Sequence, residues 1–323
     1  ITFLIALIII WMLTGINLFG VQISGKFQII FGSTKILAVG AIIGLTLTST
    51  STGNLNNFVD PLWPENFGWH TVLAVGAALR YSFFAFSGWE GATYMAEEVK
   101  NPQKTLPLSL FLGIGGVMIL YIGANLGYLY QLDPSTITKE KWVASAAMKV
   151  VLGATGGIFI SIAVAINAFG NISTQILCKS RTWHAMGRDG VFFEKFGRLD
   201  PKHNTPNNAL IGQAIWATVL LIFAVLSTFI QSGAGGTSTY ETIIDFFSAT
   251  STIFNLLTFG AIYILRKKMP DKERPYKALF YPYSMIIVLI LYTSFLIITL
   301  ITAFIPSLIG IALTASGTVY YFS

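Results

Sequence analysis

The sequence contains a single cysteine, Cys178, in 323 residues, so no disulfide can form within the chain. It has only three histidines, His70, His184 and His203; they are far apart in the sequence, His70 falls in a different predicted loop from the other two, and there is no His-x-x-x-His spacing. A catalytic metal or a nucleophile with its base needs several such groups close together. We therefore expect no enzyme, and no catalytic residue, metal site or cofactor.

Charged residues are also scarce. Only 11% of the chain is charged, whereas 54% is hydrophobic and the mean hydropathy is +0.68. This composition excludes an ordinary soluble domain and predicts an all-α integral membrane protein, because apolar runs long enough to cross a bilayer of about 30 Å recur along it. We expect about nine transmembrane helices, at residues 2–20, 27–48, 71–98, 105–131, 154–184, 207–230, 241–265, 279–304 and 306–322.

The basic residues are unevenly distributed between the predicted loops. Fifteen of the 20 lysines and arginines follow alternate spans, and only three fall in the opposite loops. Because cytoplasmic loops collect lysine and arginine, this bias predicts that loops 97–106, 179–206 and 266–278 lie in the cytoplasm. We expect a multi-pass protein of the plasma membrane. The net charge of +6 is explained by anionic headgroups of the lipid bilayer and requires no nucleic acid.

The third predicted span contains an unusual stretch, Ser87-Gly88-Trp89-Glu90-Gly91, between apolar aromatic residues. Two glycines and a carboxylate weaken a helix where a membrane span should continue. A break in a membrane helix is tolerated only inside the protein or beside a polar cavity, where its free backbone groups can hold a zwitterion. Close helix packing by small residues is the alternative interpretation.

Two further charges, Lys35 and Arg80, lie inside predicted spans. Charges at such depth are costly and commonly face a cavity or a partner. Lys35 can fill a cation position or exchange a proton; alternatively, its side chain extends to the cytoplasmic interface. Arg80 can reach the outer surface or pair with Glu90.

Several motifs together resemble the amino acid-polyamine-organocation superfamily, and most closely its L-type exchanger branch. "FFAFSGWEGATYMAEEVKNPQKTLPLSL" is similar to the region of its sixth helix, with the pattern A-E-E-x-x-N-P-x-[KR]-x-[LI]-P. "INLFGVQISGKFQIIFGSTKILAVG" resembles the end of helix four and helix five, and "SRTWHAMGRDGVFFEKFGRLDPKHNTPNNAL" the linker between helices eight and nine. "LRKKMPDKERPYKALFYPY" resembles the loop between helices ten and eleven.

The resemblance implies a LeuT-like inverted-repeat transporter bundle, in which this chain is a fragment holding helices four to twelve of twelve. A single transmembrane domain would then cover residues 1–323. Within it, residues 1–48 end the first repeat, residues 71–265 form the second repeat, and residues 279–323 are two C-terminal helices.

The resemblance also implies a site. Carbonyls around Phe84, Ala85 and Ser87 would accept a substrate ammonium, with Phe84 as a gate and Trp89 in the wall. The expected substrate-binding residues are Phe84, Ala85, Phe86, Ser87, Gly88, Trp89 and Glu90. Lys35 would take the place that sodium fills in sodium-coupled relatives, facing polar positions of helix eight, Asn167, Asn171 and Ser173.

Glu90 departs from the L-type pattern, which has an uncharged residue after Gly-Trp. Glu90 can select a cationic substrate, take a proton, pair with Arg80 or cap a helix end. The sequence thus predicts sodium-independent exchange of neutral L-amino acids by alternating access, with proton-coupled uptake, including that of cationic amino acids, as the alternative. A non-transporting membrane scaffold is a third possibility, and an accessory subunit is left open.

Overall fold

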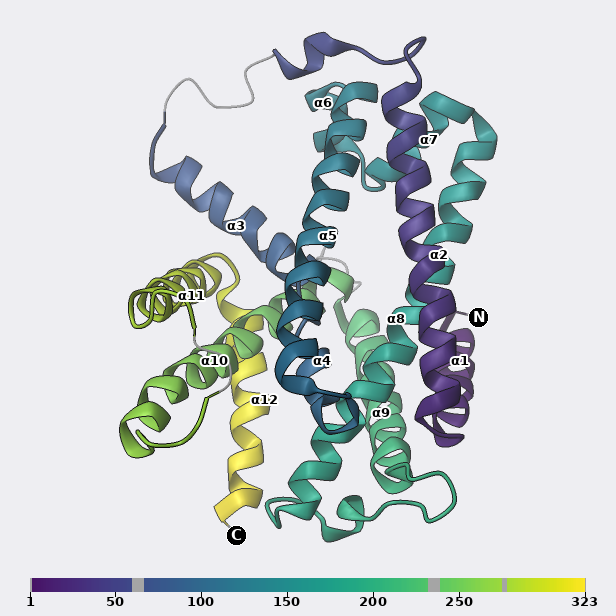
Figure 1. Cartoon of the computed structure of the whole chain (residues 1–323). Helices are drawn as coiled ribbons and strands as arrows, with labels where there is room; N and C mark the ends of the chain where they lie inside the picture. Colours follow the sequence, from purple (N-terminus) through teal and green to yellow (C-terminus); the bar gives the residue numbers. More distant parts are fainter. Residues whose placement is uncertain (1, 60–66, 232–238, 275–277, 323) are drawn as a thin grey trace. The chain divides into compact units, whose positions relative to one another are not determined.

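The computed structural model describes residues 2–59, 67–231, 239–274 and 278–322 (Figure 1). Within these residues the chain forms helices and turns and no strand, which confirms the predicted all-α fold class. Each predicted span corresponds to a helix: α1 (Thr2–Leu18), α2 (Val21–Thr48), α3 (Trp69–Ala85), α5 (Pro102–Gln131), α8 (Ala154–Arg188), α9 (Asn207–Gln231), α10 (Thr239–Lys268), α11 (Tyr283–Thr302) and α12 (Phe304–Phe322).

Several of these helices differ in their bounds from the predicted spans; α2, for example, begins at Val21 and not at residue 27. The run predicted at 71–98 is helical only to Ala85, and α8 continues to Arg188, past the predicted end at residue 184. Five stretches among the described residues are long and apolar enough to cross a bilayer: Gly25–Thr48, Pro102–Gln131, Ala154–Arg188, Phe247–Lys268 and Tyr283–Thr302. The chain is therefore a multi-pass membrane protein by length and composition.

Short helices connect the long ones. They are η1 (Leu55–Phe58), α4 (Gly91–Tyr94), η2 (Ala96–Glu98), α6 (Pro134–Lys139), α7 (Val143–Leu152) and η3 (Glu194–Gly197). Asp133 begins α6, where its side chain accepts hydrogen bonds from the backbone N–H and the hydroxyl of Thr136 at 2.9 and 2.6 Å. This is the usual role of an acidic residue at the start of a helix.

The chain packs as two compact units. The first contains residues 1–65 and 89–222, and the second contains residues 66–88 and 223–323. In the first unit, α8 packs against α1, α2, α4 and α7, and α2 also packs against α5 (Figure 1). Leu13 of α1, Ile176 of α8 and Leu210 of α9 form a buried cluster in this unit. The long helix α8 is thus the element on which most of the first unit is assembled.

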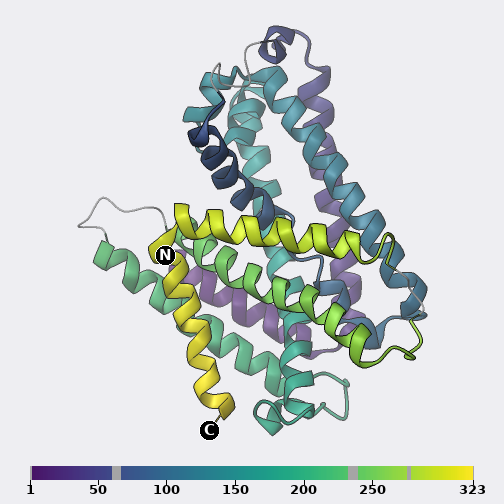
Figure 2. The ribbon, with the colours of Figure 1, turned by 90° about the vertical axis from the view of Figure 1, so that its left-hand side faces the viewer.

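In the second unit, α10 packs against α3, α11 and α12, and Figure 2 shows α10 and α11 side by side. The end of α3 is held by aromatic contacts. The ring of Phe83 stacks on Phe295 of α11 at 4.7 Å between centroids, and it meets Tyr292 edge to face at 5.5 Å. These contacts fix the last turn of α3 immediately before the chain leaves the helix.

Candidate functional site

The third predicted span is interrupted at the position that its glycines indicate. Helix α3 ends at Ala85, and the next helical residue is Gly91. Between them, Gly88 has a φ of 104°, a conformation that side-chain-bearing residues rarely adopt. The predicted break is therefore confirmed, but α4, the helix that follows it, is only four residues long and leads into η2.

The backbone carbonyl of Phe84 is a hydrogen-bond acceptor inside this turn. Ser87 donates to it twice, from its backbone N–H at 3.1 Å and from its hydroxyl at 2.7 Å. The carbonyl predicted to receive a substrate ammonium therefore has the Ser87 side chain as a resident donor. A competing donor at this carbonyl has to displace that hydroxyl.

The side chain of Phe84 packs within the second unit. Its ring meets Phe247 of α10 edge to face, at 5.6 Å between centroids. Ala85 and Phe86 are exposed, and Ser87, Gly88 and Trp89 are partly buried. The boundary between the two units falls between Gly88 and Trp89, so the seven predicted binding residues are divided between the units.

Lys35 has a partner in the first unit. Its ammonium donates to Oδ1 of Asn171 on α8 at 2.6 Å. Asn171 in turn donates from Nδ2 to Oδ1 of Asn167 at 3.4 Å. The structure thus joins three of the four residues predicted for the cation position in one chain of hydrogen bonds between α2 and α8.

Ser173, the fourth residue, belongs to a different polar group. It is fully buried and accepts hydrogen bonds from Gln28 at 3.2 Å and from Asn17 at 3.5 Å, and Gln28 also accepts one from Thr174 at 2.5 Å. Sequence reasoning missed Gln28. The signal was present, since Gln28 precedes Lys35 by seven residues and so shares its helix face.

Glu90 lies beside a lysine that the sequence assigned to a cytoplasmic loop. Oε1 of Glu90 is 3.7 Å from Nζ of Lys179 on α8. The same ammonium lies over the ring of Tyr94, 5.5 Å from its centroid. The side chain of Arg80, the partner considered from sequence, lies outside the described residues. Lys179 is therefore a charged neighbour of Glu90 that sequence reasoning did not identify.

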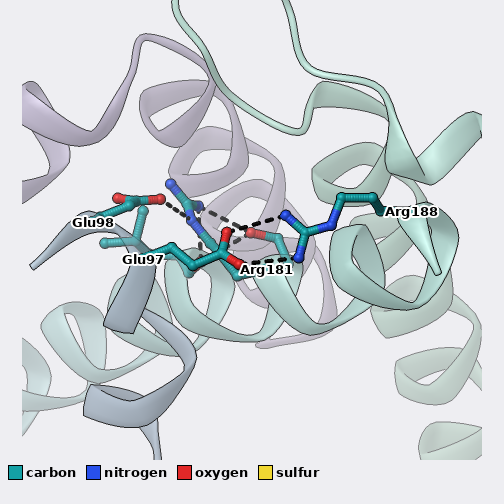
Figure 3. A network of polar contacts seen from close by, with 6 residues as sticks. Glu97, Glu98, Arg181 and Arg188 are labelled. Atoms are coloured by element: carbon teal, nitrogen blue, oxygen red, sulfur yellow. Dashed lines mark hydrogen bonds and ion pairs between the residues drawn. The ribbon is translucent and has the colours of Figure 1, made fainter. Parts of the chain in front are cut away.

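Two more ion pairs attach the residues after the break to α8 (Figure 3). Arg181 donates from Nε to Glu98 at 3.0 Å, and Arg188 donates from Nη2 and Nη1 to the two carboxylate oxygens of Glu97 at 3.0 and 3.3 Å. Arg181 is 8% exposed, whereas Arg188 is 51% exposed. Hydrogen bonding by Arg188 holds the pKa of Glu97 below its ordinary value. The two arginines are seven residues apart, so they share the helix face that η2 meets.

Metal ligands do not cluster in the residues that the structure describes: no three His, Cys, Asp or Glu side chains gather there. The side chains discussed above instead offer carbonyls, amides and single charges.

Comparison with curated proteins gives relatives along almost the whole chain. The chain is 29% identical over 320 residues to the mouse (Mus musculus) large neutral amino acids transporter small subunit 2, covering 99% of the chain and 57% of the relative. It is 27% identical over 326 residues to the mouse b(0,+)-type amino acid transporter 1, covering 99% and 62%. The cystine/glutamate transporter of Pongo abelii is 25% identical over 268 residues, covering 83% and 50%.

The chain therefore spans little more than half the length of the relatives named here. By name they are transporters, in agreement with the expectation that the chain is not an enzyme. The family model described as amino acid permease matches residues 1–322. The chain accordingly belongs to the amino acid permease family of the amino acid-polyamine-organocation superfamily.

Proposed function

We propose that the protein containing this chain is a secondary amino acid transporter that works by alternating access. The observation that carries the proposal is the interruption between Ala85 and Gly91, in a chain that belongs to the amino acid permease family. An interrupted membrane helix exposes backbone carbonyls and amides to a substrate zwitterion. The seven residues 84–90 are the proposed binding segment.

In this proposal the substrate ammonium exchanges with a donor that is already present. The Ser87 hydroxyl donates a hydrogen bond of 2.7 Å to the Phe84 carbonyl in the structure. When the substrate binds, its ammonium takes over that carbonyl, and the serine hydroxyl rotates to another acceptor. The exchange of one hydrogen bond for another keeps the carbonyl satisfied throughout, as a site in an apolar environment requires. Phe84 acts as the gate and Trp89 contributes to the wall.

Lys35 is proposed to replace a coupling cation. Its ammonium donates to Asn171, which in turn bonds to Asn167, so the lysine headgroup is held between α2 and α8. A fixed ammonium supplies the charge that a bound sodium ion would otherwise bring. Transport is therefore expected to be independent of sodium. Ser173 supports the same helix pair through Gln28.

Neutral amino acids are the proposed substrates, and exchange is the proposed mode. Two mouse relatives are named for amino acid transport, one of them specifically for large neutral amino acids. Glu90 favours a second candidate, proton-coupled uptake that extends to cationic amino acids, because it puts a carboxylate three residues after Ser87. A scaffold without transport is the least favoured candidate, since it gives Lys35 and the interruption no purpose.

The wider organisation is proposed by analogy. The repeat boundaries at residues 1–48 and 71–265, the plasma-membrane location and the cytoplasmic side of loops 97–106, 179–206 and 266–278 follow from the family resemblance and the bias of basic residues. The relatives named as small subunits suggest that an accessory subunit joins the protein. The lipid bilayer is the surrounding solvent.

Proteoliposomes containing the full-length protein test this function. We expect leucine uptake to require an internal amino acid, to continue without sodium and to be unaffected by a proton gradient, because exchange needs only a substrate on each side. Uptake into empty vesicles driven by an inward proton gradient would replace exchange with the second candidate. No amino acid uptake under any gradient would leave only the scaffold.

A further inference from the structure

Gly170, a buried residue of α8, lies beside the end of the Lys35 side chain, and both residues belong to the first unit. A Cβ placed on Gly170 would lie 3.1 Å from Cε and 3.3 Å from Nζ of Lys35. It would also lie 2.9 Å from Cβ of Phe31 on α2. Carbon atoms in good contact are about 3.5–4.0 Å apart. The lysine headgroup therefore occupies the space that a side chain on Gly170 would need.

The acceptor of the Lys35 ammonium is the residue that follows Gly170. Nζ of Lys35 donates to Oδ1 of Asn171 at 2.6 Å. Gly170 and Asn171 are neighbours on α8, so the ammonium lies against one residue and bonds to the next. A side chain on Gly170 would move the donor of this hydrogen bond, and hydrogen bonds weaken when their length and angle depart from the favoured values.

Other contacts hold α2 against α8 close to the lysine. The ring of Phe31 lies 5.5 Å from that of Phe169 on α8, and the ring of Phe27 stacks on Phe31 at 4.2 Å and lies 5.9 Å from Phe169. Gln28 donates to Ser173 at 3.2 Å. These contacts oppose a separation of the two helices. The flexible end of the lysine is thus the part that an added side chain displaces most easily.

We infer that Gly170 is a positioning residue for transport, because its lack of a side chain leaves the space in which the Lys35 ammonium reaches Asn171. The inference rests on the proposed function, in which that ammonium replaces a coupling cation. Close helix packing is the other common use of glycine in membrane helices. A packing role would make replacement of Gly170 affect stability and leave the lysine headgroup in place, so the two roles differ in a measurable property.

The first measurement follows the lysine itself. The full-length protein in proteoliposomes is treated briefly with acetic anhydride, and acetylation of Lys35 is measured by mass spectrometry relative to Lys26 on the same helix. An amine released from its acceptor reacts faster. We expect Gly170→Ala to raise this ratio about threefold, and Gly170→Val and Asn171→Ala to raise it about tenfold, because they remove the hydrogen bond. The matched control is Gly32→Ala on α2, where nothing lies within 4 Å of the added Cβ, and it should leave the ratio unchanged.

The second measurement is leucine exchange in the same vesicles. Gly170→Val is expected to lower the exchange rate about tenfold, close to the effect of Lys35→Ala, because both changes leave Asn171 without the ammonium. In the Lys35→Ala background, Gly170→Val should slow exchange by less than about twofold, because the effects of residues that act together do not add. Gly32→Ala should exchange leucine like the unchanged protein.

The two measurements separate this inference from the proposed function. If the unchanged protein exchanges no leucine, the proposed function fails, whereas acetylation still decides whether Gly170 positions the lysine. If acetylation of Lys35 in the Gly170 variants equals that in Gly32→Ala, the inference is overturned. It is also overturned if acetylation rises but exchange stays at the rate of Gly32→Ala.

Folding of the variants does not leave the question open. Gly170→Ala is the smaller change, and it is sufficient for the decision if Gly170→Val does not fold. If neither variant folds, Gly170 has a packing role and the inference is overturned.

Discussion

Replacement of Lys35 by alanine is expected to lower amino acid exchange by about 10- to 150-fold, the equivalent of losing one hydrogen bond to a charged group, about 1.5–3 kcal/mol. The reason is the 2.6 Å bond from the Lys35 ammonium to Asn171, which supplies the proposed fixed cation between α2 and α8. Without the Lys35 ammonium, Asn171 and Asn167 of α8 remain, but no positive charge lies between α2 and α8. Exchange rates of leucine in proteoliposomes measure the effect.

The matched control for this prediction is Lys26→Ala. Lys26 is an exposed lysine near the start of the same helix, so its removal should leave exchange within about twofold of the unchanged protein. The leucine exchange rate of Lys35→Ala should also be measured with added sodium, because removal of the Lys35 ammonium leaves a cation position that sodium can enter. An exchange rate in Lys35→Ala equal to that in Lys26→Ala would remove Lys35 from the mechanism.

Replacement of Arg181 by methionine is expected to destabilise the protein by about 1.5–3 kcal/mol, the range for hydrogen bonds to a charged group, because the acceptors of a buried guanidinium lose their donor. Arg181 is 8% exposed and bonds to Glu98 at 3.0 Å, to the carbonyl of Leu177 at 2.9 Å and to Ser180 at 3.1 Å. Methionine keeps most of the volume and loses all three bonds. Glu98 then remains beside α8 without this guanidinium. Equilibrium unfolding of the full-length protein in detergent measures the loss.

Arg188→Met is the matched variant on the same helix. Arg188 makes a two-pronged contact with Glu97, but both side chains are largely exposed, at 51% and 73%. An exposed pair contributes less than about 1 kcal/mol, so this variant should unfold almost like the unchanged protein. Equal losses for the two variants would mean that burial does not distinguish the pairs, and the structural description of η2 against α8 would be wrong.

Sequence patterns predicted the interruption because it depends on local chemistry. Gly88 adopts a positive φ that glycine alone tolerates easily; Ser87 precedes it and a second glycine, Gly91, follows three residues later. The pairing of Lys35 with Asn171 was foreseeable for a related reason: few polar residues occur in the apolar spans, so the number of possible partners was small. Because the apolar spans contain few polar groups, these contacts could be predicted from the sequence.

Other contacts could not be read from the sequence. Ser173 is only two residues from Asn171, but two residues turn a helix by about 200°, so its hydroxyl bonds to Gln28 and Asn17 and not to Lys35. Lys179 was placed in a loop because the end of α8 carries charges and lacks an apolar pattern. The helix nevertheless continues to Arg188, where Glu97 and Glu98 contribute ion pairs from a segment about 90 residues earlier. The packing of the helices, and not a local sequence pattern, determines which residues so distant in sequence become partners.

The claim that residues 84–90 bind the substrate is tested most directly by ligand protection of a cysteine at Ser87. The single Cys178 is first replaced by alanine, together with any cysteine of the full-length protein outside this chain, and Ser87→Cys is then introduced. Thr138→Cys on α6, an exposed position outside the binding segment, serves as the control. Saturating leucine is expected to slow modification of Ser87→Cys by a thiol reagent about tenfold and to leave Thr138→Cys unaffected. Equal modification rates with and without leucine, in a protein that still exchanges leucine, would contradict the proposed site.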